Sequence, residues 1–125
     1  MQTKSIESVG ELIKGIMFIK DYLHHIEAAA FNVFCRLGRG KSPSTYKQLL
    51  IEEFITRGVP MKDFTNEIRV NDSILVQVFA KSKLDAILEN EFVNQLTSTN
   101  TELGYIINFG LSTQVLRKFK RDRFI

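Results

Sequence analysis

The chain has 125 residues and a mass of 14.4 kDa, which is enough for one ordinary domain and too little for two. It is 44% hydrophobic and 25% charged and has only two prolines, a composition that excludes a disordered chain. The net charge of +3 is local, because residues 117–125 carry five basic side chains and one acidic one, whereas the other 116 residues carry twelve basic and thirteen acidic ones. The sequence therefore predicts a basic end on a nearly neutral body.

The only cysteine, Cys35, excludes an internal disulfide and a cysteine-rich zinc site, and it favours a reducing compartment. It lies in an apolar helical stretch, so we expect a core residue rather than a nucleophile. The most apolar N-terminal run, residues 12–19, contains Lys14 and is far shorter than the roughly 20 residues of a membrane span. No signal-peptide cleavage site follows it. We expect a soluble intracellular protein without a membrane span.

The first half of the sequence has helical periodicity. Ser8 begins a capping-box pattern, and the apolar residues up to position 37 predict one long helix or two consecutive ones. Glycines at 38 and 40 end this region, because glycine readily adopts the left-handed conformation found after helices. Ser42 and Pro43 predict the start of another helix, which should end near Gly58.

The periodicity then changes to that of strands. Residues 65–70 and 73–80 predict two strands, and Asn71-Asp72 between them suits a tight hairpin turn. The second run is apolar on both faces, as in a strand that is covered on both sides.

Ser82 and Asp85 have capping-box spacing and predict a helix that continues to residue 96. Residues 103–109 predict another strand, and residues 114–119 a last one. The order of helices, hairpin, helix and two strands, without repeats or linkers, indicates a single α+β domain.

Several segments share motifs with one known family. Residues 37–46, 57–60, 70–80, 91–96 and 115–120 follow its order, and residues 103–110 (LGYIINFG) give the most specific match. In one register from about residue 26 to 121, the chain resembles the GxxExxY proteins, small members of the PD-(D/E)XK nuclease-like superfamily. The resemblance implies an α/β sandwich with a short mixed sheet flanked by helices at 26–125. Residues 1–25 lie largely outside the resemblance, and we expect them to form an N-terminal helical extension.

The resemblance also implies where a nuclease of this superfamily would hold one or two divalent cations and a lysine. The chain departs from that pattern, because the corresponding positions carry Pro43, Glu67, Gln77, Phe79, Glu91 and Gln95. Of the acidic positions only Glu67 keeps a carboxylate, and Phe79 replaces the lysine. The segment between Val59 and Glu67 is shorter than in the family and is expected to lack a strand-turn segment. We therefore expect no catalytic residues, no metal and no cofactor.

A relocated metal site is the alternative. Lys81, on the same strand face as Gln77 and Phe79, could replace the lysine, and Glu67, Asp72 or Glu91 could supply ligands. Such a chain would be a divergent, active metal-dependent nuclease. We favour the simpler interpretation that the aromatic ring fills a dismantled site and that the lysine is a solvated strand end, because a metal site needs several converging ligands.

Two histidines, His24 and His25, are adjacent and would point about 100° apart on a helix, so a surface pair is expected rather than a chelate.

The basic end is the best candidate for a binding surface. Its bases could neutralise phosphates, and Phe119 and Phe124 could stack on nucleobases. The candidate nucleic-acid-binding residues are Lys81, Lys83, Arg117, Lys118, Lys120, Arg121 and Arg123. A solvated strand end, or docking to an acidic partner, would explain the same pattern. The predicted function is a catalytically degenerate nuclease-fold protein that acts as a binding or assembly module and contacts nucleic acid without sequence preference.

The apolar positions Ile13, Ile16, Met17 and Phe18 run almost around the predicted N-terminal helix. Such a helix must be buried by something, so a homo-oligomer or a larger protein assembly is expected through this segment. A structural subunit of a larger complex is therefore the third possible function.

Overall fold

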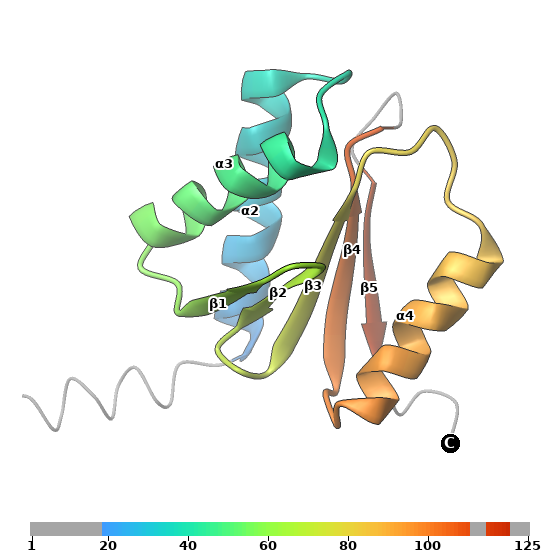
Figure 1. Ribbon diagram of the computed structural model, residues 1–125. Coiled ribbons are helices and arrows are strands. Elements are labelled where there is room, and N and C mark those ends of the chain that lie inside the picture. Colours follow the sequence, from blue (N-terminus) through green and yellow to red (C-terminus); the bar gives the residue numbers. More distant parts are fainter. Residues whose placement is uncertain (1–18, 111–114, 121–125) are drawn as a thin grey trace, which may run out of the picture.

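The computed structural model describes residues 19–110 and 115–120, which form three helices and a five-stranded mixed sheet (Figure 1). In chain order the elements are α2 (Ile19–Leu37), α3 (Pro43–Thr56), β1 (Met61–Phe64), β2 (Glu67–Val70), β3 (Ile74–Phe79), α4 (Ala86–Ser98), β4 (Leu103–Asn108) and β5 (Val115–Lys120). The predicted α+β class is therefore confirmed.

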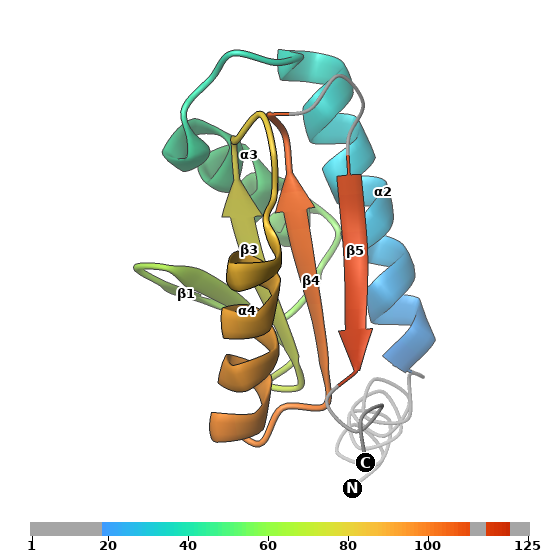
Figure 2. The ribbon, with the colours of Figure 1, turned by 90° about the vertical axis from the view of Figure 1, so that its right-hand side faces the viewer.

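The sheet has the order β1-β2-β3-β4-β5. Neighbouring strands are antiparallel except for β3 and β4, which are parallel and are joined by α4 as a crossover. The helices cover both faces of the sheet: α2 and α3 lie on one face and α4 on the other (Figures 1 and 2). This sandwich explains why the first half of β3 is apolar on both faces, as the sequence predicted.

Helix α2 ends where the glycines predict. Gly38 follows it with a φ of 64° and donates its N–H to the Phe34 carbonyl at 2.7 Å. The helix is continuous through residue 25, so the predicted boundary between an extension and a domain falls within it. The expected capping box at Ser8 and the apolar stripe that follows it lie outside the described residues. The prediction that Cys35 is a core residue is wrong, because it lies on the exposed side of α2, two residues beyond the buried Val33.

Helix α3 starts as predicted, with Ser42 as its N-cap and Pro43 in its first turn. Tyr46 anchors this start. Its ring is fully buried and stacks on Phe109 at 4.4 Å between centroids, and its hydroxyl donates to the Gly38 carbonyl at 2.5 Å. One side chain thus joins the α2–α3 loop to the end of β4.

The segment after α3 contradicts one prediction. We expected no strand-turn segment between Val59 and Glu67, but β1 occupies it and pairs along its length with β2. Three of its four residues are exposed, so this edge strand shows no apolar alternation that a sequence could reveal. Lys62 and Asp72 form an exposed ion pair at 3.3 Å across the same edge.

The predicted hairpin of β2 and β3 is confirmed. Asn71 and Asp72 both have positive φ, 54° and 53°, which asparagine and aspartate tolerate better than most residues. The last paired residues are Val70 and Ile74, so the loop has three residues rather than two.

Helix α4 is capped by Asp85, whose carboxylate accepts a hydrogen bond from the Leu88 N–H at 2.9 Å. The prediction that Ser82 begins this helix is wrong, because the helix starts at Ala86 and Asp85 alone caps it. Gly104 of β4 lets α4 lie close to the sheet, since a Cβ there would be 2.6 Å from the Phe92 ring.

The end of β4 is joined to the end of β3 by Asn108. This fully buried side chain accepts hydrogen bonds from the N–H groups of Lys81 and Gly110 and donates to the Lys81 carbonyl, at 2.9, 3.1 and 2.9 Å. A Cβ on Gly110 would lie 2.4 Å from the Lys81 backbone, so only glycine fits. The structure therefore explains three residues of the LGYIINFG segment, Gly104, Asn108 and Gly110, by their packing and hydrogen bonds.

The main core lies between the sheet and the helices α2 and α3, and a smaller cluster lies under α4. Tyr105 reaches through the main core to donate its hydroxyl to Glu27 of α2 at 2.5 Å. Burial, and then the neighbouring carboxylate, raise the pKa of the Tyr105 hydroxyl above its usual value. Among the described helices, none combines the length and the apolar character that crossing a membrane requires.

Candidate binding cleft

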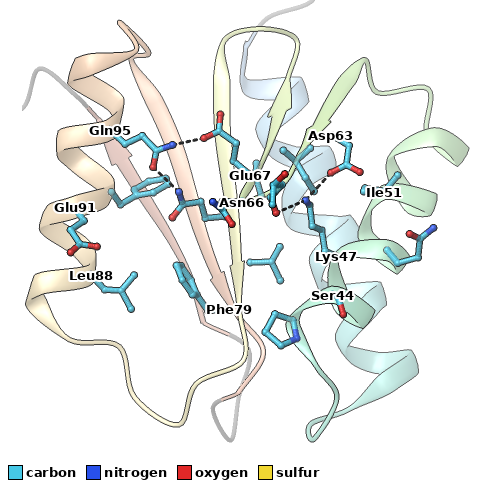
Figure 3. Close-up of a pocket in the computed structure, with 18 residues that line it drawn as sticks. Ser44, Lys47, Ile51, Asp63, Asn66, Glu67, Phe79, Leu88, Glu91 and Gln95 are labelled. Carbon is cyan, nitrogen blue, oxygen red and sulfur yellow. Dashed lines mark hydrogen bonds and ion pairs between the residues drawn. The ribbon is translucent and has the colours of Figure 1, made fainter.

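A cleft of about 570 Å³ lies between α3 and α4, with β2 and β3 as its floor. Figure 3 shows its two walls facing one another across the strands. The residues that line it include Ser44, Lys47 and Ile51 from α3 and Leu88, Glu91 and Gln95 from α4.

The structure brings together all six positions that correspond to the nuclease pattern, the five at which the sequence departs from it and Glu67, which keeps its carboxylate. The cleft is lined by Pro43, Glu67, Gln77, Phe79, Glu91 and Gln95. They come from two helices and two strands, and no local sequence signal would gather them. The other two candidates lie elsewhere: Asp72 is in the hairpin loop, and Lys81, which follows the end of β3, is exposed and does not line the cleft.

A chain of hydrogen bonds crosses the floor of the cleft (Figure 3). The Gln77 amide donates to the Gln95 side-chain oxygen at 2.7 Å, and the Gln95 amide donates to the Glu67 carboxylate. The second oxygen of Glu67 accepts from Nε of Arg69 at 2.7 Å. The side chains of Glu67 and Arg69 are only 13% and 17% exposed, so water screens this ion pair weakly. Both oxygens of the carboxylate are thus engaged by neighbouring side chains.

The partner of Glu67 is itself fixed in place. Arg69 donates to the hydroxyl of Thr101 at 3.1 Å, and Thr101 is 4% exposed. Arg69 was not among the residues predicted from the sequence, although it lies two residues after Glu67 on β2 and a strand presents such residues on the same face.

Lys47 is the cation of the opposite wall, and it too was not among the predicted site residues. Its ammonium group pairs with Asp63 at 2.7 Å and donates to the carbonyls of Phe64 and, at 3.3 Å, Thr65. These contacts hold the β1–β2 turn against α3. Since all three bonds go to the protein, this lysine is poorly placed to bind a phosphate from solution.

Some polar groups of the cleft have no partner within the part of the chain that the structure describes. Glu91, which is exposed, makes no hydrogen bond or ion pair there, and neither do Asn66 and Gln48. The side-chain oxygen of Gln77 is also not engaged. Of the three carboxylates that line the cleft, Glu67 is neutralised by Arg69 and Asp63 by Lys47, so Glu91 leaves the lining with a net negative charge.

The floor of the cleft includes an open edge of β3. The pairing of β2 with β3 ends at Val76, whereas the pairing of β4 with β3 continues to Phe79. The carbonyl of Phe79 accepts from the Phe109 N–H at 2.8 Å, so the backbone groups of Phe79 point toward β4. Backbone groups alternate sides along a strand. The N–H and C=O of Val78 therefore point away from β4, to the side where β2 has already ended, and Val78 lines the cleft there.

The predicted nucleic-acid-binding residues do not gather on one surface. Lys81 and Lys83 are exposed between β3 and α4. On β5, Arg117 lies on the α4 face and pairs with Glu89 at 2.5 Å, while Lys118 and Lys120 lie on the opposite face. Arg121 and Arg123 lie outside the described residues.

Phe119 was expected to be available for stacking on nucleobases. It is half-buried and packs edge-to-face on Phe92, with 5.3 Å between the ring centroids, so α4 already occupies one side of its ring. Phe124 lies outside the described residues.

The adjacent histidines do not form a chelating pair. His24 is exposed, while His25 is half-buried with its Nδ1 at 3.4 Å from the Arg57 guanidinium, and the two ring centroids are 6.2 Å apart. Within residues 19–110 and 115–120, no group of three or more His, Cys, Asp or Glu side chains is arranged to hold a metal ion.

Comparisons with known proteins leave the family open. No family model matches the chain, no curated protein is similar enough to count as a relative, and no solved structure matches it. Membership of the GxxExxY family therefore stays a prediction from the sequence motifs.

Proposed function

We propose that this protein is a PD-(D/E)XK-like domain whose cleft has changed from a catalytic site into a binding site. Two observations support the proposal. The positions that correspond to the nuclease pattern lie far apart along the chain, and all of them line one cleft. A short mixed sheet with helices on both faces, which includes the β2–β3 hairpin, is the arrangement that the resemblance implies.

The functional part of the proposal rests on the hydrogen bonds that occupy both oxygens of the Glu67 carboxylate. A divalent cation would have to compete with Arg69 for one carboxylate oxygen and with Gln95 for the other. Gln77 offers a neutral amide oxygen, and Mg²⁺ loses its water reluctantly without charged ligands. Phe79 supplies neither charge nor a proton to a transferring phosphoryl group. The floor is thus a polar network in which both oxygens of Glu67 are engaged, and it is suited to holding a shape rather than a metal.

A cleavage assay tests this proposal. Purified protein is incubated with linear, nicked and single-stranded DNA and with RNA, in the presence of Mg²⁺ or Mn²⁺. We expect no turnover, and we expect none from Gln77→Glu combined with Phe79→Lys, because Pro43 still replaces the acid of the helix. Turnover that disappears in Glu67→Ala or Lys81→Ala would contradict the proposal and identify a relocated active site.

The second part of the proposal is a nonspecific contact of the basic end with nucleic acid. Lys118 and Lys120 are exposed on β5 and have no ion pair within the described residues, which supports it. Affinity should fall steeply with salt, and each lost phosphate contact should lower the slope by about one.

Replacement of Arg117, Lys118, Lys120 and Arg121 by Ser tests the basic end, with Lys62→Ser on β1 as the control. Lys62 is an exposed base at the opposite edge of the sheet, so its loss should leave the slope unchanged. Wild-type protein that binds neither DNA nor RNA at low salt would contradict this part and favour a protein assembly.

A further inference from the structure

We infer that the cleft binds an extended, basic segment of a partner protein, which pairs with the open edge of β3 and directs a Lys or Arg side chain to Glu91. This inference rests on the proposed function, because it names the kind of partner that the converted cleft would accept.

The open edge of β3 offers backbone hydrogen bonds to a partner. The Val78 N–H and C=O face the cleft next to the point where β2 ends, and they have no backbone partner within the described residues. A peptide backbone offers the complementary acceptor and donor, and adding a strand to an exposed sheet edge is a common mode of peptide recognition. An extended peptide bound there would lie beside β3, starting at the point where the pairing of β3 with β2 ends.

The charge of the cleft favours a basic partner. Lys47 pairs with Asp63 and Arg69 with Glu67, whereas Glu91 has no ion pair among the residues that the structure describes. A negative lining disfavours phosphate and favours an ammonium or guanidinium group. Phe79 and Leu88 line the cleft beside Glu91 and offer apolar surface to the aliphatic stem of such a side chain (Figure 3).

The cleft is large enough for a short peptide. A volume of about 570 Å³ lies within the range of pockets that bind drug-sized ligands, so it can hold a few residues of an extended chain. Gln48 of α3 and Asn66 of the β1–β2 turn line the same cleft, and their side chains make no hydrogen bond among the described residues, so they can bind peptide groups that face away from β3.

A titration followed by ¹⁵N NMR tests the inference. The probe is the capped pentapeptide acetyl-Ser-Val-Arg-Val-Ser-amide, and the matched control carries Glu in place of Arg. The arginine peptide should shift the Val78 amide and the side-chain amides of Gln77 and Gln95, and the glutamate peptide should not. Two further peptides test strand pairing. Each carries methyl groups on alternate backbone nitrogens, which block hydrogen bonding along one edge of the extended chain, and the two peptides are blocked on opposite edges. Only one edge can face β3. One of the two should lose binding and the other should keep it.

A pair of variants tests the charge. Glu91→Gln should weaken the arginine peptide by up to about fivefold, as expected for a partly exposed ion pair. Glu52→Gln, an identical change on α3 at an exposed position away from the cleft, should leave the affinity unchanged. The inference is overturned if no cleft resonance shifts at the solubility limit of the arginine peptide, if the glutamate peptide binds equally well, or if both methylated peptides bind. It is also overturned if a single-stranded oligonucleotide, and not the peptide, shifts the cleft resonances. A failed titration together with absent cleavage overturns this inference alone, whereas cleavage that depends on Glu67 overturns the proposed function as well.

Discussion

The two halves of β3 have different surroundings although they belong to one strand of six residues. Ile74, Leu75 and Val76 pair on both edges, with β2 and β4, and all three are fully buried. Gln77, Val78 and Phe79 pair only with β4 and are half-buried. The difference arises because β2 has only four residues and turns away toward β1. Where one strand extends beyond its neighbour, the sheet presents backbone groups and side chains to a cleft, while the rest of the strand stays packed in the core.

The same comparison separates stability from binding. The closed half of β3 is apolar and contacts core on both faces, so its residues determine whether the chain folds. The open half takes part in the network of Gln77, Gln95 and Glu67, which orders the cleft. Substitutions in the two halves should therefore differ first in their effect on stability.

The largest expected effect is the contrast between Leu75→Ala and Phe79→Ala. Both side chains belong to the cluster under α4, but Leu75 is fully buried and Phe79 only partly. Leu75→Ala should lower the free energy of unfolding by about 3 kcal/mol, and Phe79→Ala by about 1 kcal/mol despite its larger side chain. Urea denaturation followed by circular dichroism measures both. An equal or larger loss for Phe79→Ala would show that the open half is part of the folding core.

The next effect concerns the connection that closes the far end of β3. Asn108→Ala leaves the N–H groups of Lys81 and Gly110 and the Lys81 carbonyl without their partner. The free energy of unfolding should fall by about 2 kcal/mol, because three backbone groups lose bonds that a buried amide supplied. Asn94→Ala, an exposed position on α4, is the matched control and should change stability little. A small loss for Asn108→Ala would mean that water replaces the amide and that this end of β3 is open as well.

A smaller effect should come from the ion pair of the cleft. The single variants Glu67→Gln and Arg69→Met, together with the double variant, form a thermodynamic cycle that isolates the pairing of these two side chains. We expect a coupling free energy of about 1 kcal/mol, above that of most exposed pairs, since both side chains are mostly buried. A coupling near zero would contradict the claim that Arg69 commits the Glu67 carboxylate.

Much of the fold could be predicted from the sequence because its signals are local. The N-cap at Ser42, the glycine after α2 and the hairpin residues Asn71 and Asp72 act through their own backbone geometry, and the structure confirms each of them. The missed strand β1 has no such signal, because it is short, exposed and held by pairing with β2 rather than by its own apolar pattern. The prediction that Cys35 is buried was wrong, because an apolar stretch does not reveal which side of a helix packs on the core.

The cleft could be predicted only in part. The motif comparison named residues that do line it, such as Gln77 and Gln95, but it could not supply their hydrogen bonds. Arg69 and Lys47 were missed because their roles depend on partners brought near by the tertiary fold, and in the case of Lys47 on Asp63 of the unpredicted strand. The open edge at Val78 has no sequence signal, since it follows from the unequal lengths of two neighbouring strands.

Amide hydrogen exchange along β3 is the most direct test of this account. Val76 and Phe79 should exchange slowly, because their backbone groups pair with β2 and β4, and Val78 should exchange much faster, because its N–H faces the cleft unpaired. Saturation with the arginine pentapeptide should slow Val78 and leave Val76 and Phe79 unchanged. Exchange at Val78 that is as slow as at its neighbours in the free protein, or that the bound peptide does not slow, would contradict the account of an open edge that binds a partner.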